Sequence, residues 1–179
     1  GPTLTTLGGR QLQGKELSYN NIRDLDVAWK GVCAFNSFVK NAAPVNGIDY
    51  SEYNGIICGK NPDGTKASPT GKPITTSFAG AANSVFTIAL KHNTPCGASL
   101  GSTSLESYKQ TYDCDSVSIF GGIVGCSAII DKPCAEEMVK CFLEVIVAPG
   151  FTKEALEVFS EKKNLRLITA EIPADDEYE

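Results

Sequence analysis

Short apolar runs, separated by segments rich in glycine, proline and polar residues, organise the second half of the chain. Such runs occur at 85–90, 123–130, 144–148 and 165–169. Each run is short for a helix and carries several β-branched residues, so we predict a buried strand at each position. The first of these strands is expected to be buried on both of its faces.

Helix-start signals lie between these runs. A capping-box sequence begins at Thr103, an Asp-Lys-Pro sequence begins at Asp131, and Thr152 is a further candidate cap. We therefore predict helices over 103–113, 131–143 and 152–163.

A fourth helix is predicted earlier in the chain, between Leu25 and Asn41, because apolar residues recur there at helical spacing. The polar stretch at 11–26 contains a possible short strand and an Asn-Asn pair that suits a turn or a helix cap. The apolar positions of the helix are Leu25, Ala28, Trp29, Val32, Phe35, Phe38 and Val39.

Residues 41–80 form a segment of another kind, in which glycine, proline, asparagine and threonine recur every few positions. Only Gly55–Gly59 has the apolar character of a strand, so we predict a short hairpin followed by a long loop, Lys60–Pro73. A loop of this length is either mobile or functional. Its lysines could contact a phosphate, but a solvated loop is the better explanation.

The alternation of strands and helices after this segment predicts a mostly parallel sheet that helices cover on both faces. A length of 179 residues suits one domain with a sizeable core. Gly1-Pro2 is typical of the remnant of a cleaved expression tag. We therefore expect residues 3–179 to form a single α/β domain with an inserted loop or hairpin at about 41–80.

Composition narrows the possible partners. The net charge is −5 and the basic residues are scattered, so nucleic acid is not an expected partner. The apolar runs are too short to cross a bilayer, and no signal peptide is visible, so no membrane association is expected.

The cysteines number seven, an odd count, and most of them lie in apolar stretches, which favours reduced thiols in a cytoplasmic protein. No pair has C-x-x-C spacing, so a zinc site is not expected.

Two chemically active side chains, Lys91 and His92, follow the first predicted strand, and His92 is the only histidine in the chain. A Pro-Cys-Gly breaker comes soon after, which places the pair at the carboxyl end of a strand, where α/β sheets bind ligands. Repulsion from the lysine cation favours a neutral imidazole that can accept a proton, and the lysine can hold an anion. A lone histidine is often structural, so catalytic and structural roles remain equally open.

The segment after this pair offers weaker signals. Gly97–Thr103 precedes a capped helix, and its backbone N–H groups could bind an anion, although the glycine spacing is not that of a P-loop. Cys96 is a candidate nucleophile near His92, but a small residue in a tight turn is the simpler explanation. Neither Pro-Cys pair is followed by the second cysteine that zinc nucleobase deaminases require.

Five sequence motifs, in this order, resemble those of the bacterial AICAR transformylase family. This family is the formyltransferase half of a bifunctional purine-biosynthesis enzyme whose other half is IMP cyclohydrolase. The motifs are G-K-E-L-S-Y-N-N-I-R-D-L-D-V-A-W (Gly14 to Trp29), K-H-N-T-P-C-G (Lys91 to Gly97), S-I-F-G-G-I (Ser118 to Ile123), E-V-I-V-A-P-G-F (Glu144 to Phe151) and K-K-N-L-R-L (Lys162 to Leu167).

The resemblance implies both a fold and a reaction. The fold would be a cytidine-deaminase-like, three-layer α/β/α subdomain without zinc, the first of two such subdomains. The reaction would transfer a formyl group from the co-substrate 10-formyltetrahydrofolate to the 5-amino group of aminoimidazole carboxamide ribonucleotide. The implied partners are the purine-precursor nucleotide, the folate, and either a second copy of the chain in a homodimer or a second transformylase subdomain.

The resemblance also implies roles for individual residues. His92 would accept the proton of the amine, while Lys91 would polarise the formyl oxygen or support His92. The positions that contact the nucleotide would be Asn21, Phe120, Gly121 and Glu144. A second hypothesis, from another functional class, is a nucleotide-binding or assembly module of the same family without turnover.

Overall fold

The structure is a computed structural model that describes residues 9–41 and 85–172. The predicted strand at Gly55–Gly59 and the loop Lys60–Pro73 lie outside the described residues. The described elements are β1 (Arg10–Gln13), α1 (Tyr19–Asn41), β2 (Val85–Lys91), β3 (Thr94–Gly101), α2 (Ser104–Cys114), β4 (Gly122–Cys126), α3 (Lys132–Met138), β5 (Leu143–Ala148), α4 (Lys153–Phe159) and β6 (Arg166–Thr169).

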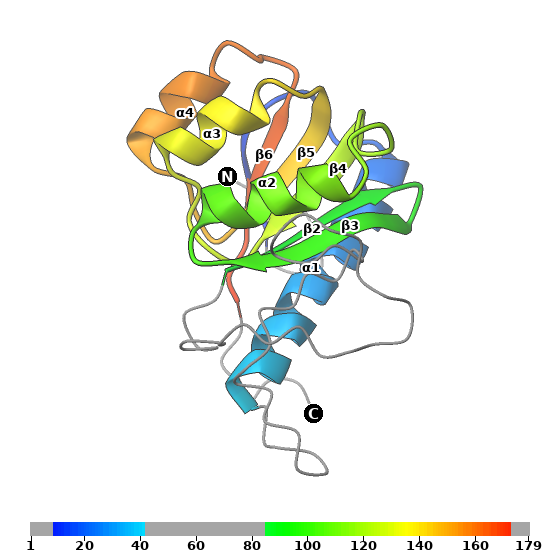
Figure 1. The fold of residues 1–179 in the computed structure, drawn as a ribbon. Helices are drawn as coiled ribbons and strands as arrows, with labels where there is room; N and C mark the ends of the chain where they lie inside the picture. The colour runs from blue at the N-terminus through cyan, green and yellow to red at the C-terminus, as the bar shows by residue number, and fades with distance from the viewer. Residues whose placement is uncertain (1–8, 42–84, 173–179) are drawn as a thin grey trace.

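These elements form a six-stranded mixed sheet between two layers of helix (Figure 1). Helix α1 packs on one face, where Leu25, Trp29 and Val32 are buried as the helical spacing predicts. Helices α2, α3 and α4 cover the other face. The sheet thus has one hydrophobic core on each face. In strand β2, Ile88 faces α1 while the next residue, Ala89, belongs to the core on the opposite face. The predicted helices and the three-layer arrangement are therefore present in the structure.

The prediction of a mostly parallel sheet is wrong. The strand order is β1-β6-β5-β4-β2-β3, and only the β4–β5 and β5–β6 pairs are parallel. Strand β2 pairs antiparallel with both β3 and β4, and β1 pairs antiparallel with β6. The sequence pattern missed β3 because its proline and glycines resemble a loop, yet β3 is an edge strand, where proline is tolerated.

Strands β2 and β3 form a hairpin closed by a very tight turn. Lys91 pairs with Thr94, so His92 and Asn93 alone make the connection. Both have positive φ angles, 52° and 60° respectively, which is the conformation of a type I′ hairpin turn. The segment Gly97–Thr103 is therefore largely strand, and its residues 97–101 are buried. Strand β3 therefore occupies most of the segment whose N–H groups were considered as a weak candidate for anion binding.

Side-chain caps begin the helices as predicted, but two helices end earlier than expected. The side-chain oxygens of Thr103, Asp131 and Thr152 each accept a hydrogen bond from a backbone N–H in the first turn. Helix α3 ends at Met138 and α4 at Phe159, because the chain then turns to enter β5 and β6. Within the residues that the structure describes, no helix combines the length and apolar character needed to cross a membrane.

Helix α1 begins before Leu25, the first residue of the predicted helix. Ser18 precedes the helix, and its hydroxyl oxygen accepts a hydrogen bond of 3.1 Å from the backbone N–H of Asn21. The amide oxygen of Asn21 in turn accepts one of 3.1 Å from the backbone N–H of Ser18. This reciprocal pair satisfies two backbone donors at the helix start, as a capping box does.

Glycines in β3 allow α2 to lie unusually close to the sheet. A Cβ added to Gly101 would come within 2.6 Å of the backbone nitrogen of Ser107, and one added to Gly97 within 2.7 Å of the carbonyl oxygen of Thr111. Both of these α2 atoms belong to backbone, so they cannot move aside without shifting the helix.

We expect Gly101→Ala to lower the free energy of unfolding by about 1–3 kcal/mol, because the added methyl group overpacks this interface. Urea unfolding followed by circular dichroism measures the change. Gly150→Ala is the matched control, since its added Cβ would meet only an Ile129 side-chain carbon at 3.7 Å. Equal stability of the two variants would show that α2 can withdraw from β3 without cost.

Candidate functional site

The predicted site residues come from different elements but gather at one edge of the sheet. Strand β2 runs antiparallel to β4, with Leu90 opposite Ile123, so the carboxyl end of β2 lies beside the amino end of β4. Strand β5 is parallel to β4 and presents its own amino end at this edge. The hairpin tip, the start of α1 and the segment before β4 lie on the same side of the molecule (Figure 1). The edge thus combines the carboxyl end of β2 with the amino ends of β4 and β5, which a wholly parallel sheet could not do.

Lys91 is anchored over the turn that leads into β4. Its Nζ donates a hydrogen bond of 2.7 Å to the carbonyl oxygen of Phe120. Gly121 follows with a φ of 73°, a left-handed conformation that glycine adopts without strain. Its N–H donates to the carbonyl oxygen of Phe142 at 2.7 Å, which ties the turn to the start of β5. Of the residues that the sequence predicted for the site, Lys91 therefore contacts Phe120 directly, and Gly121 follows Phe120 in the same turn.

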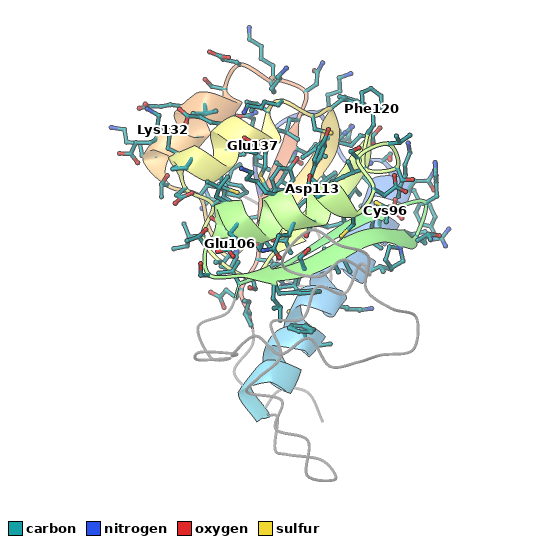
Figure 2. The ribbon with its side chains drawn as sticks, in the orientation of Figure 1. Cys96, Glu106, Asp113, Phe120, Lys132 and Glu137 are labelled. Carbon is teal, nitrogen blue, oxygen red and sulfur yellow. The ribbon has the colours of Figure 1, made fainter. Side chains whose placement is uncertain are left out.

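Two aromatic rings form an exposed surface beside this lysine. The residues Phe120 and Phe142 are 58% and 54% exposed, and their ring centroids lie 5.3 Å apart at an angle of 54°. Figure 2 shows Phe120 on the same side of the molecule as Cys96. Because the two rings are tilted against each other, each exposed ring separately offers a flat apolar face to a planar ligand.

Asn21 and Glu144 are joined by a direct hydrogen bond. The amide nitrogen of Asn21 donates to the Oε2 atom of Glu144 at 2.9 Å. Asn21 is only 5% exposed, and its oxygen already accepts the N–H of Ser18. The pair therefore fastens the start of α1 to β5, while Glu144 remains partly exposed at the sheet edge.

His92 and Lys91 are adjacent in the sequence, but the structure places their side chains in different surroundings. His92 is exposed in the two-residue turn of the hairpin, whereas Lys91 is half-buried and contacts Phe120. The turn is held by Asn93, whose backbone N–H donates to a carboxylate oxygen of Asp24 in α1 at 2.9 Å. Within the described residues, the imidazole makes no hydrogen bond or ion pair. Its ring is consequently available to a ligand but is not oriented by a protein partner.

The environment of Cys96 disfavours the nucleophile hypothesis. Partial burial raises the pKa of the Cys96 thiol, and the carboxylate of Asp115 acts in the same direction, although Lys91 opposes it. Cys96 is a free thiol, as are Cys126, Cys134 and Cys141. Cys114 is disulfide-bonded, contrary to the expectation of reduced cysteines, and Cys58 lies outside the described residues.

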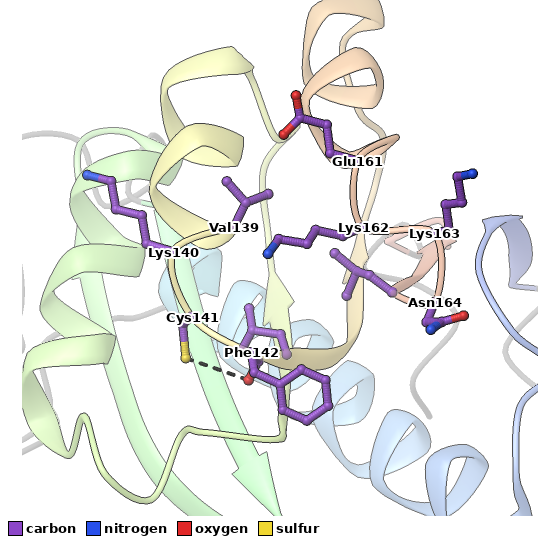
Figure 3. A pocket seen from close by; sticks show the side chains of 10 residues that line it. Val139, Lys140, Cys141, Phe142, Glu161, Lys162, Lys163 and Asn164 are labelled. Atoms are coloured by element: carbon purple, nitrogen blue, oxygen red, sulfur yellow. Dashed lines mark hydrogen bonds between the residues drawn. The ribbon is translucent and has the colours of Figure 1, made fainter.

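A cavity that the sequence pattern does not predict lies next to this edge. Residues 139–143, between α3 and β5, and residues 161–165, between α4 and β6, enclose about 410 Å³ (Figure 3). The predicted helices 131–143 and 152–163 run through both segments, whereas in the structure these residues form the two turns that enclose the cavity. The motif beginning at Lys162 belongs to it and was the available signal.

An α/β domain that gathers a lysine, exposed aromatic rings and a carboxylate at one sheet edge has the features of a small-molecule-binding domain. The chain belongs to the AICARFT/IMPCHase bienzyme family, whose model matches residues 2–59 and 70–179. That match includes every residue of the predicted site.

Bacterial relatives support the same assignment. The chain is 41% identical over 172 residues to the bifunctional purine biosynthesis protein PurH of Clostridium acetobutylicum. This alignment covers 96% of the chain and 25% of the relative. The chain is 40% identical over 162 residues to the protein of the same name from Clostridium botulinum strain 657, and this alignment covers 90% of the chain and 23% of that relative. The chain thus spans about a quarter of the length of these relatives.

Solved structures are more distant. The RibD protein of Acinetobacter baumannii overlaps 76% of this chain and 33% of its own with a TM-score of 0.43 and 8% identity. A dCMP deaminase from the cyanophage S-TIM5 overlaps 46% of this chain and 77% of its own with a TM-score of 0.35 and 12% identity. TM-scores this low do not establish a shared fold.

We expect Asn21→Asp to destabilise the protein by about 2 kcal/mol at pH 7, because it places a second carboxylate against Glu144 in a buried position. Acidification protonates one of the two carboxyl groups and removes their repulsion. The stability difference from the unmodified chain should therefore narrow as the pH falls from 7 toward 4, as measured by urea unfolding at each pH.

The second substitution Glu144→Gln, made in the Asn21→Asp protein, is the matched control for this prediction. A glutamine amide can donate to the new aspartate and should recover most of the lost stability. A pH-independent loss, or no recovery in the double variant, would mean that the Asn21–Glu144 contact does not hold α1 against β5.

We also expect iodoacetamide to modify Cys96 several-fold more slowly than it modifies free cysteine at pH 7.5. The raised pKa leaves less thiolate, which is the reactive form. Peptide mapping by mass spectrometry measures the rate, which should continue to rise above the pH at which free cysteine levels off. A rate equal to or faster than that of free cysteine would restore Cys96 as a candidate nucleophile.

Proposed function

We propose that this chain carries the Lys91–His92 half of a formyl-transfer site in purine biosynthesis. The reaction moves a formyl group from 10-formyltetrahydrofolate to the 5-amino group of aminoimidazole carboxamide ribonucleotide. The observation that carries the proposal is the Lys91 ammonium held at 2.7 Å over the Phe120–Gly121 turn in a member of this family. The proposal includes a cytidine-deaminase-like subdomain that works without a metal, in the cytoplasm.

The nucleotide would occupy the sheet edge described above. The flat imidazole ring suits the exposed ring of Phe120, and the turn at Gly121 lets the ligand approach the backbone closely. The carboxylate of Glu144 can accept a hydrogen bond from an amide or a hydroxyl group of the ligand. Asn21 would act by holding that carboxylate in place through its 2.9 Å hydrogen bond.

The chemistry would divide between the lysine and the histidine. The amine nitrogen attacks the formyl carbon, and the proton that it loses passes to the imidazole of His92. The new C–N bond forms as the bond from the formyl carbon to folate N10 breaks, and N10 takes up a proton. The ammonium of Lys91 would stabilise the negative charge that develops on the formyl oxygen, in exchange for its contact with Phe120.

The alternative is a nucleotide-binding or assembly module without turnover. Two observations favour it: the Lys91 ammonium is engaged by a backbone carbonyl, and His92 is exposed in the hairpin turn. Relatives of this family are about four times longer, so further site residues would come from a second transformylase subdomain or from the partner copy in a homodimer.

Calorimetric titration with aminoimidazole carboxamide ribonucleotide tests the proposal. We expect a Kd in the micromolar range, which corresponds to a binding free energy of about −8 kcal/mol. Binding should weaken about tenfold in Lys91→Ala, which loses a cation at the site, and it should also weaken in His92→Ala. Lys153→Ala, which removes an exposed lysine at the start of α4, should bind like the unmodified chain.

Turnover then separates the two candidates. With 10-formyltetrahydrofolate and the companion subdomain present, loss of the base in His92→Ala should lower the rate by about 10²–10⁴-fold. Nucleotide binding without any turnover would favour the binding or assembly module. No binding at millimolar nucleotide, or equal binding by the unmodified chain and Lys91→Ala, would contradict the proposed site.

A further inference from the structure

The two-residue turn that carries His92 has a backbone conformation that is costly for its sequence. His92 and Asn93 both lie in the left-handed region, with φ angles of 52° and 60°. Turns of this type usually have glycine at the second position, where this chain has asparagine. Even histidine and asparagine, which tolerate the conformation better than most residues, adopt it at a cost. Contacts from outside the hairpin are therefore important in keeping the turn in this form.

Helix α1 supplies such contacts through Asp24. The Oδ1 atom of its carboxylate accepts the backbone N–H of Asn93 at 2.9 Å. With the Asn93 amide oriented to satisfy both of its neighbours, its nitrogen donates to the same oxygen at 2.7 Å, and its oxygen accepts a hydrogen bond of 3.0 Å from Nη2 of Arg23. Arg23 in turn lies over the ring of Tyr19, with 5.9 Å between its Cζ and the ring centroid. Two consecutive residues of α1 thus hold one residue of the turn.

The position of Asp24 within α1 does not explain its presence. The helix begins at Tyr19, and the reciprocal pair of Ser18 and Asn21 caps it. Asp24 lies beyond the first turn, where a carboxylate interacts only weakly with the helix dipole. Its carboxylate bonds instead to a residue 69 positions further along the chain.

Helix α1 also connects this turn to the rest of the candidate site. Asn21 and Asp24 are three residues apart, so they are neighbours on one face of the helix. Asn21 donates to Glu144 at 2.9 Å, while Asp24 accepts from the hairpin. The helix therefore sets the distance between the Glu144 carboxylate and the turn of His92, independently of the bond that holds Lys91.

We propose that Asp24 is a positioning residue for the formyl transfer, because its Oδ1 atom holds the turn from which the His92 imidazole reaches the substrate amine. The inference rests on the proposed function, which requires a base at His92. Asp24 acts through the backbone of Asn93 and leaves the imidazole free to rotate onto the nucleotide. A displacement of about 1 Å at a reacting group can lower a rate by about 10²-fold, so a contact outside the reacting groups is sufficient to control turnover.

Two substitutions of Asp24 separate its hydrogen bonds from its charge. Asp24→Asn keeps an oxygen that can accept both bonds, whereas Asp24→Ala removes the acceptor. In the full chain, we expect the N–H of Asn93 to exchange with solvent about tenfold faster in Asp24→Ala and at nearly the unmodified rate in Asp24→Asn, as measured by NMR. The Kd for the nucleotide should stay within about threefold of the unmodified value in both variants, because Lys91, Phe120 and Glu144 keep their contacts.

Turnover with 10-formyltetrahydrofolate and the companion subdomain provides the second measurement. We expect kcat to fall about 10–100-fold in Asp24→Ala and to recover to within about threefold of the unmodified value in Asp24→Asn. A lower kcat at an unchanged nucleotide affinity is the result expected for a displaced base. The control Glu157→Ala, which removes an exposed carboxylate from α4, should behave like the unmodified protein in every measurement. Thermal unfolding should confirm that all three variants are folded.

Four results would overturn the role of Asp24 and leave the proposed function intact. Unchanged exchange at Asn93 in Asp24→Ala would show that Asp24 does not hold the turn, and faster exchange with unchanged kcat would show that the turn does not control the reaction. Equal losses of kcat in Asp24→Asn and Asp24→Ala would assign the effect to charge, and parallel losses of kcat and nucleotide affinity would assign Asp24 a purely structural role. The absence of turnover in the unmodified protein is a separate result, which overturns the proposed function and this inference with it.

Discussion

The antiparallel pairing of β2 with β4 is the constraint on which the site depends. Strands β4, β5 and β6 run parallel, so their amino ends share one edge of the sheet. Because β2 runs the other way, its carboxyl end, with Lys91, comes to that same edge. A parallel β2 would leave this lysine at the opposite edge, a strand length away from the turn at Phe120 and Gly121.

Local hydrogen bonds then fix the position of each contributor. Lys91 is bonded to the Phe120 carbonyl, the Gly121 N–H to the Phe142 carbonyl, and Asn21 to Glu144. Each bond joins an element to a different neighbour, so the edge behaves as one connected unit. His92 is the exception, since only the backbone of its turn is held, through the bond from Asn93 to Asp24. The catalytic hypothesis therefore requires that the substrate itself, or a further part of the enzyme, orients the imidazole.

Much of the fold follows from sequence signals that act over a few residues. Apolar runs correctly located β2, β4, β5 and β6, and the caps at Thr103, Asp131 and Thr152 correctly located three helix starts. The sequence pattern predicts ends for α3 and α4 that are several residues too late, because helix-forming residues continue past the point where the chain must turn into the next strand. Strand β3 was missed because its glycines are needed for the close approach of α2, a tertiary requirement that leaves no apolar pattern.

The sequence by itself determined the apolar periodicity, the caps and the order of the motifs, because these depend on neighbouring side chains and on backbone preferences. It therefore placed the chain in its family and selected Lys91, His92, Phe120 and Gly121 as a set. Only the tertiary structure decided that β2 runs antiparallel to β4. It also decided that Lys91 reaches Phe120 while His92 lies in an exposed turn, and that two turns enclose a cavity lined by lysines. These features depend on strand direction and on contacts between distant segments, and no local pattern of residues encodes either.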